Sequence, residues 1–192
     1  IPTYPVVFTR FNNTLVPHNG KMLSTTHSKE FDWEAELTIV IGKKCRNVPK
    51  EKALSVIAGY ACFNDGSIRD WQRKSGGQFT LGKNFDATGG FGPDIVTPDV
   101  LPKGAAPLRI STRVNGVTMQ DSNTDDLIFD VPTLVHELSK CMTLDPGDII
   151  ITGTPSGVAM ARKPQPWLKP GDVCEVEIEG IGTLRNTIAQ GG

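Results

Sequence analysis

The sequence predicts an α+β fold that is predominantly β, with only a few short helices. Its 20 glycines and 14 prolines indicate many turns between short elements. Apolar runs of strand length recur along the chain, and Val173–Glu179 alternates apolar with acidic residues, as a strand with one buried face does. One segment, Val131–Met142, shows clear helical periodicity. Together these observations favour a β-rich architecture.

The first half of the chain is predicted to contain strands around one short helix. Phe31–Gly42 is the first strand, because it contains a continuous β-branched run. A helix is expected to start near Pro49 and to include Ile57, and Ile57–Phe63 is a short apolar strand. Leu108–Met119 is predicted to form a hairpin, because its Asn-Gly pair supplies the positive φ angles of a type I′ turn.

The second half is predicted to hold the longest helix and two more strands. Helix Val131–Met142 has Asp130 as its N-cap and Pro132 in its first turn. The strands Asp148–Thr152 and Val173–Glu179 each follow a Pro-Gly-Asp turn. Because no shift in composition marks a linker, we expect a single domain over residues 1–192.

Composition limits the possible classes of function. The formal net charge is −1 and there is no basic block, which argues against nucleic acid or an anionic membrane as a partner. No apolar run approaches the ~20 residues that cross a bilayer. The 4 cysteines include no Cys-x-x-Cys pair, so neither a zinc site nor a disulfide framework is indicated. We therefore expect a soluble, cytoplasmic protein with reduced thiols.

Two carboxylates stand two residues apart in the first predicted strand. Glu34 and Glu36 point to the same face of a strand, together with Asp32 and Thr38. Burying an unpaired carboxylate is costly and a second one adds repulsion, so the pair is either exposed to solvent or neutralised by a metal ion. The spacing alone favours a half-exposed strand with an acidic outer face.

A third carboxylate, Asp65, follows the apolar run that ends at Phe63. If Asp65 meets the two glutamates in space, the three would suit Mg²⁺, Mn²⁺ or Ca²⁺. Taken by itself, Asp65 is equally compatible with an Asx turn or a helix cap. Arg69 could pair with Asp70 at the surface or offer a bidentate fork to a substrate carboxylate. The local sequence leaves these alternatives open.

Two further segments could take part in a site. Most lysines placed like Lys83 reach solvent, but beside a metal its ammonium would stabilise a developing enolate or oxyanion. The Gly-Thr-Pro-Ser-Gly loop at Gly153–Gly157 could hold a carboxylate or phosphate, or form an ordinary turn, and it lacks the ending of a P-loop. The histidines His18, His27 and His136 fit no Ser-His-Asp order, so a serine hydrolase is disfavoured.

Several of these segments, taken in order, resemble the fumarylacetoacetate hydrolase (FAH) family, and specifically its C-terminal catalytic domain. The matching motifs span essentially the whole chain: Asp32–Lys43, Gly59–Gln72, Gly82–Asp86, Val114–Gly116, Leu144–Val158 and Glu179–Asn186. The resemblance implies a mixed β-sheet roll, a homodimer, and a divalent cation for which Mg²⁺ is the first choice. It also overturns the expectation of a solvated acidic face.

The resemblance also implies roles for individual residues. Metal ligands would be Glu34, Glu36 and Asp65, and the cation would chelate a 2-oxo acid or β-diketone. Lys83 would assist charge stabilisation as a catalytic residue together with Arg69, while substrate would contact Gln72, Gly153 and Thr154. Relatives that hydrolyse acylpyruvates carry a His- and Glu-bearing lid upstream of the matched region, and Ile1 is expected to start after such a segment.

The leading hypothesis from the sequence is a metal-dependent hydrolase that cleaves a carbon–carbon bond in an acylpyruvate or related 2-oxo acid. In this hydrolase the cation would act as an electron sink, because it polarises the ketone and stabilises the departing enolate. Without a lid base, the same cation would serve a decarboxylase or an enol–keto isomerase acting on a 2-oxo dicarboxylate, because neither reaction needs activated water. The rival from a different class is a catalytically inert binding protein with the same fold. Small 2-oxo acids are the expected partners, with no nucleic acid and no membrane.

Overall fold

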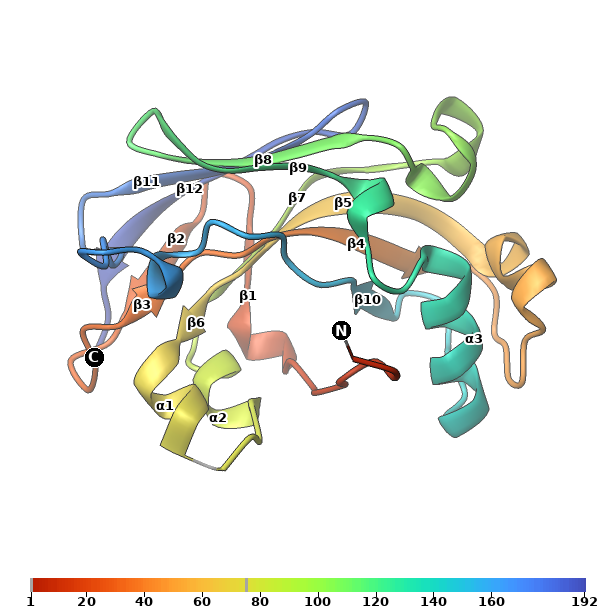
Figure 1. The fold of residues 1–192 in the computed structure, drawn as a ribbon, viewed down its shortest axis with the longest axis horizontal. Coiled ribbons are helices and arrows are strands. Elements are labelled where there is room, and N and C mark those ends of the chain that lie inside the picture. The colour runs from red at the N-terminus through yellow and green to blue at the C-terminus, as the bar shows by residue number, and fades with distance from the viewer. Residues whose placement is uncertain (1, 75) are drawn as a thin grey trace.

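The computed structural model describes residues 2–74 and 76–192, and in this part of the chain the strands form two five-stranded sheets and one two-stranded sheet (Figure 1). The predicted α+β, predominantly β class is confirmed. The first sheet has the spatial order β1 (Leu15–Pro17), β7 (Gly89–Val96), β5 (Ile57–Asp65), β4 (Ala35–Ile41), β10 (Ile149–Ile151). The second has the order β2 (Lys21–Ser24), β12 (Gly182–Gln190), β11 (Val173–Ile178), β8 (Arg109–Val114), β9 (Val117–Asn123). The small sheet pairs β3 (Phe31–Asp32) with β6 (Ser67–Ile68).

The helices are short and lie at the rim of the sheets (Figure 1). The α-helices are α1 (Arg69–Lys74), α2 (Thr80–Lys83) and α3 (Val131–Cys141). Short 3₁₀ helices cover Asn12–Thr14, Lys50–Val56, Pro98–Val100, Lys103–Ala105, Thr124–Asp126 and Ala159–Ala161. Helix α3 confirms the prediction, since Asp130 caps it by accepting a hydrogen bond from the Thr133 N–H at 2.9 Å.

The helix expected near Pro49 is partly wrong. The segment Lys50–Val56 is 3₁₀ rather than α-helical, and Ile57 begins β5 instead of ending the helix. Ile57 pairs with Ile41 on β4, and two β-branched side chains fit a sheet better than a helix turn. Strand pairing therefore overrides the local helical pattern at this residue.

The predicted hairpin is confirmed at its turn. Strands β8 and β9 are joined at Asn115 and Gly116, whose φ angles are 50° and 80°. Two consecutive positive φ angles are what a type I′ turn requires. The alternation in β11 is confirmed too, because Cys174, Val176 and Ile178 are all buried.

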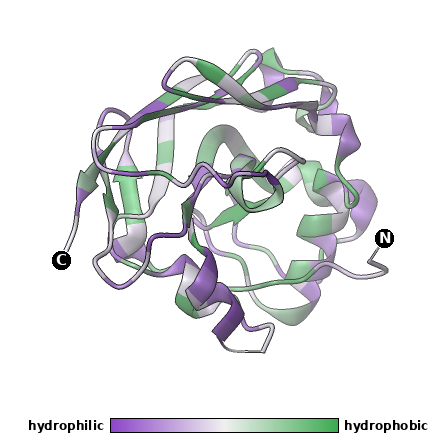
Figure 2. Ribbon diagram, turned by 60° about the vertical axis from the view of Figure 1, so that its left-hand side comes forward, coloured by the Kyte–Doolittle hydropathy of each residue, from purple (hydrophilic) through white to green (hydrophobic). Residues whose placement is uncertain are grey.

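Two hydrophobic clusters fill the interior. The larger contains β4 residues such as Leu37 and Ile39 together with Val135 of α3, and the smaller surrounds Trp33 and Met22. Figure 2 shows hydrophobic residues gathered on the strands and hydrophilic ones along the outer loops and helices. Among the described helices, none is long and apolar enough to cross a bilayer.

The strand predicted as Phe31–Gly42 is interrupted, which corrects the expectation of one continuous element. Trp33 and Glu34 belong to no strand and separate β3 from β4. Three consecutive backbone N–H groups at the break donate to side chains instead of to a neighbouring strand: Trp33 to Asp32, Glu34 to Asn64 and Ala35 to Gln120. These side-chain acceptors satisfy the backbone, so the ladder can stop there at little cost.

Candidate metal centre

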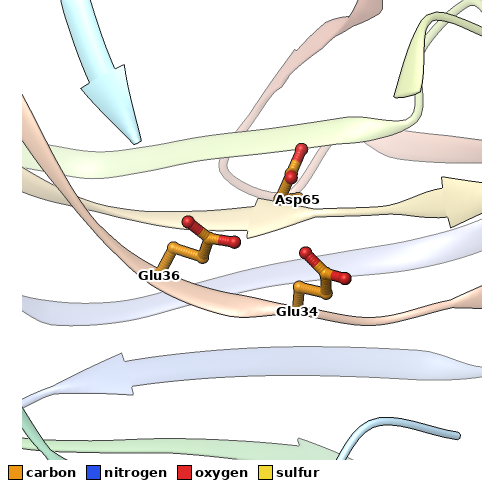
Figure 3. A group of neighbouring side chains, drawn as sticks. All are labelled: Glu34, Glu36 and Asp65. Atoms are coloured by element: carbon orange, nitrogen blue, oxygen red, sulfur yellow. The ribbon is translucent and has the colours of Figure 1, made fainter. Parts of the chain in front are cut away.

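Three carboxylates meet where β4 and β5 run side by side (Figure 3). Glu34 precedes β4, Glu36 lies within it, and Asp65 is the last residue of β5. One oxygen from each lies within 4.8 Å of the others. The antiparallel pairing brings them together, since the Asp65 N–H donates to the Glu34 carbonyl at 2.9 Å. The site that the sequence suggested therefore exists as a cluster.

The cluster is buried, which overturns two interpretations. Glu34, Glu36 and Asp65 are 7%, 4% and 1% exposed, so the acidic outer face favoured by spacing alone is wrong. Asp65 forms neither an Asx turn nor a helix cap, because its carboxylate bonds to Arg10 and Lys83. Buried carboxylates need compensation, and the surrounding residues provide most of it.

Lys83 is the cation between two of the carboxylates. Its Nζ lies 2.7 Å from Glu34 and 2.5 Å from Asp65. The side chain is buried and does not reach solvent, unlike most lysines. Lys83 ends α2, and Gly82 before it lets this helix pack closely, because a Cβ there would lie 2.5 Å from the Gln72 backbone nitrogen.

Arg69 is a buried partner of the acidic strand rather than of Asp70. Its Nε lies 2.8 Å from Asp32 and its Nη2 lies 2.6 Å from Glu34. Its Nη1 donates to the Gln72 amide oxygen at 2.9 Å, so these two residues act as a unit on α1. Asp70 instead accepts a hydrogen bond from Ser28, so of the two alternatives left open for Arg69 the surface pair with Asp70 is wrong.

Arg10 is the third cationic side chain that contacts the carboxylate cluster, and it was not predicted from the sequence. Its guanidinium lies 2.5 Å from the Asp65 carboxylate and also donates to the Gly66 carbonyl, the Thr88 hydroxyl and the Thr14 hydroxyl. The side chain is 4% exposed. A lone arginine in an irregular segment carries no periodic or spacing signal, so only the folded chain shows its role.

The Gly-Thr-Pro loop closes the cluster at Glu36. The Gly153 N–H donates to the Glu36 carboxylate, and Gly153 has a φ of 105°, which favours glycine. Thr154 follows, and its hydroxyl accepts a hydrogen bond from the Gln120 amide at 2.9 Å. The loop therefore supplies an N–H group and a hydroxyl beside the carboxylates, as the sequence suggested.

Charge is distributed unevenly across the cluster. Burial raises the pKa of Glu36 well above its usual value, and the nearby Asp65 and Glu34 charges raise it further. Burial would also raise the pKa of Asp65, but Lys83 and Arg10 outweigh it and lower that pKa. Within residues 2–74 and 76–192, no ion pair joins Glu36 to a cationic side chain. Glu36 is therefore the carboxylate whose ionised form an additional cation would stabilise most.

The donor set fits a hard divalent cation. Three carboxylates offer only oxygen, which Mg²⁺, Mn²⁺ and Ca²⁺ prefer. Glu34 and Asp65 already bind protein cations, but each carboxylate oxygen has two lone-pair directions and can accept a second partner. A cation here would also compensate Glu36.

The three histidines lie outside the carboxylate cluster. His136 contacts the Val48 carbonyl at 2.7 Å, and His18 accepts from the Arg185 N–H at 3.1 Å. His27 packs edge-on against Trp71. Each therefore has a local packing or hydrogen-bonding role.

The family model described as fumarylacetoacetate (FAA) hydrolase, C-terminal, matches residues 1–189. This chain belongs to the fumarylacetoacetate hydrolase family. The resemblance drawn from the sequence motifs is thereby confirmed.

Named relatives within the FAH family differ in reaction. Rat mitochondrial oxaloacetate tautomerase Fahd2a is 41% identical over 190 residues, which cover 98% of this chain and 60% of the relative. A 5-carboxymethyl-2-hydroxymuconate delta-isomerase from Mycobacterium smegmatis superposes with a TM-score of 0.90 at 39% identity, covering 100% of this chain and 71% of that one. A fumarylacetoacetate hydrolase from Exiguobacterium antarcticum gives 0.91 at 39% identity, covering 97% and 66%. The chain spans 59% to 65% of three curated relatives that it matches.

Proposed function

We propose that this FAH-family chain isomerises the enol and keto forms of a small 2-oxo dicarboxylate, with a divalent cation, Mg²⁺ first, held by Glu34, Glu36 and Asp65. The observation that carries the proposal is the buried group of three carboxylates with the Lys83 ammonium between two of them. The similarity to an oxaloacetate tautomerase and to a delta-isomerase supports this reaction class. When bound, the cation would supply a Lewis acid that polarises the 2-oxo group.

Lys83 would carry the charge and proton chemistry of the protein. Isomerisation removes one proton from the enol oxygen and adds one to the neighbouring carbon, with no net gain or loss of atoms. The Lys83 Nζ bears protons beside the cluster and is shielded from water, so its field on a developing enolate oxygen is strong. Arg69 would hold Glu34 in place while Gln72 orients the guanidinium.

The loop at Gly153 and Thr154 would bind the substrate carboxylate. It lies against Glu36 through the Gly153 N–H, and the Thr154 hydroxyl stands next to it. A charge-assisted hydrogen bond from the Thr154 hydroxyl would both attract an anion and fix its orientation. This arrangement would place the 2-oxo group toward the three carboxylates.

Hydrolysis of an acylpyruvate is the second candidate. It is supported by the fumarylacetoacetate hydrolase that superposes on this chain. Cleavage of the carbon–carbon bond would need a base to activate water, in addition to the electron sink that isomerisation uses. Decarboxylation of the same 2-oxo dicarboxylate needs only the sink.

Product analysis separates these reactions. Protein loaded with Mg²⁺ or Mn²⁺ would be incubated with oxaloacetate, acetylpyruvate and fumarylpyruvate, and products followed by NMR. Faster equilibration of enol and keto oxaloacetate, without CO₂ or pyruvate, is the expected result. Pyruvate plus an acid would indicate hydrolysis, and CO₂ would indicate decarboxylation.

Metal dependence is tested separately by thermal melting. EDTA should lower the Tm and Mn²⁺ should restore it, because a ligand at about 100 times its Kd stabilises the folded state by about 2.7 kcal/mol. Glu36→Gln should remove this shift. If neither EDTA nor metal changes the Tm and no substrate is turned over, the result would favour a catalytically inert binding protein.

A further inference from the structure

The side-chain amide of Gln120 joins the acidic strand to the substrate loop. Gln120 lies on β9 and is 1% exposed. Its oxygen accepts hydrogen bonds from the Ala35 N–H at 2.9 Å and from the Thr112 hydroxyl at 2.8 Å. Its nitrogen donates to the Thr154 hydroxyl at 2.9 Å and to the Pro155 carbonyl at 2.8 Å. Every hydrogen-bonding position of this amide is therefore used.

The orientation of this amide is determined by its backbone partners. The Ala35 N–H can only donate, so the atom that faces it must be the amide oxygen. The Pro155 carbonyl can only accept, so the atom that faces it must be the amide nitrogen. Because both ends are fixed, the group that points at Thr154 is an N–H donor.

The consequence falls on the Thr154 hydroxyl. Its oxygen already accepts from Gln120, so its own hydrogen must point away from the amide. In the part of the chain that the structure describes, this hydroxyl donates no hydrogen bond. The adjacent Gly153 N–H donates to Glu36, so Thr154 belongs to the loop segment that contacts the carboxylate cluster.

We infer that Gln120 is a positioning residue that donates to the Thr154 hydroxyl and leaves its hydrogen directed at the ligand, so that the site favours ligand groups that can accept, such as a carboxylate. This inference rests on the proposed function, since it concerns the group that the loop would bind. An ammonium group at the same place can only donate, so it could not accept the Thr154 hydrogen. Selectivity for acceptors thus depends on a residue that does not itself touch the ligand.

The Gln120 amide also connects the Thr154 hydroxyl to the acidic strand. Ala35 lies between Glu34 and Glu36 in sequence, so the same side chain fixes the backbone of the strand and the hydroxyl of the loop. Replacing Gln120 by glutamate keeps the size but changes the group that faces Thr154 from a donor to an acceptor. Thr154 would then turn its hydrogen inward and lose its donor function toward the ligand.

The test is binding of oxalate, a dicarboxylate that cannot react, to the Mn²⁺-loaded full chain by calorimetry at pH 8. Thr154→Val should raise the Kd for oxalate about ten- to hundredfold, because a hydrogen bond to a charged group is lost. Thr154→Ser should restore nearly normal binding. Gln120→Glu should weaken oxalate binding in the wild-type background but add less than about twofold in the Thr154→Val background, because the two changes act through one hydroxyl.

Thr118→Val is the matched control, since Thr118 is an exposed threonine on the same strand. It should leave the Kd unchanged. Unchanged oxalate binding in Thr154→Val, or fully additive effects in the double variant, would overturn the inference while the metal site stands. If wild-type protein binds neither Mn²⁺ nor oxalate, the proposed function itself fails. Thr154→Val and Thr154→Ser keep the donor claim testable if Gln120→Glu does not fold.

Discussion

Lys83 illustrates what burial does to a single charge. Its ammonium is shielded from water and is held by Glu34 and Asp65, which raise its pKa although burial would lower it. The two carboxylates in turn depend on this ammonium. Removing one member of such a group leaves the others buried without compensation.

Lys83→Met should therefore destabilise the metal-free protein by about 3–5 kcal/mol. Urea unfolding in EDTA measures this change in the free energy of unfolding. Lys140→Met is the control, because Lys140 is exposed and its ion pair with Glu137 contributes little to stability. Equal losses in both variants would contradict the role given to Lys83.

Arg10 supports a metal ligand from outside the metal site. It fixes one oxygen of Asp65 while Lys83 holds the other. Arg10→Met should weaken Mn²⁺ binding about 10- to 100-fold, as loss of an outer partner does at other metal sites, and Arg10→Lys should recover part of it.

Calorimetric titration with Mn²⁺ distinguishes positioning by Arg10 from simple charge. If Arg10 only repels a nearby cation, Arg10→Met would bind Mn²⁺ more tightly. Arg113→Met is the control, because Arg113 is an arginine that pairs with other carboxylates, Glu175 and Glu177, and forms no ion pair with the metal-centre carboxylates. Its Mn²⁺ affinity should equal that of the wild type.

Residues of the site differ in how far sequence could predict them. Glu34, Glu36 and Asp65 were predictable because they sit in motifs of matching order, although their spacing alone pointed to an exposed face. Arg10 was not, because its contacts with Asp65 cross 55 positions of the chain. Gln120 was missed for the same reason, since its bond to Ala35 crosses 85 positions.

Elements that depend on local chemistry were predicted well. The Asn-Gly turn of β8 and β9, the capped helix α3 and the alternation in β11 each follow from neighbouring residues. The break between β3 and β4 was not predicted, because side chains from other elements replace the ladder there. The segment before β5 was predicted as an α-helix but is a 3₁₀ helix, and Ile57 pairs with β4 instead of belonging to the helix.

Two strands carry thiols that make stability depend on pH. Burial raises the pKa of Cys62 on β5 to about 12 and that of Cys174 on β11 to about 12. Unfolded thiols titrate near their usual value of about 8.5. The folded state therefore keeps protons that the unfolded state releases, so this stability is complete below about pH 8.5 and is lost as the pH rises toward 12.

Each thiol should contribute a slope of about 1.4 kcal/mol per pH unit in this alkaline window. Urea unfolding between pH 9 and 11 measures the slope, and Cys62→Ala should make it shallower. Cys141→Ala should leave it unchanged, because Cys141 is exposed. An unaltered slope in Cys62→Ala would show that this thiol ionises freely in the folded protein.

At the scale of the whole molecule, we propose that the chain assembles as a homodimer. The described surface carries exposed apolar side chains, including Ile95, Val100, Val117 and Ile128. Light scattering after size exclusion should give twice the chain mass of 20.8 kDa. A mass of one chain at micromolar concentration would refute the proposal.

The break between β3 and β4 also gives the site its own reporter. The amide hydrogens of Trp33, Glu34 and Ala35 are held by side chains, two of which come from other strands. Exchange of the Glu34 and Ala35 hydrogens requires that Asn64 and Gln120 release them, and exchange of the Trp33 hydrogen requires release by Asp32. The rate of deuterium uptake at these amides therefore reports local opening of the metal centre, separately from unfolding of the sheets around it.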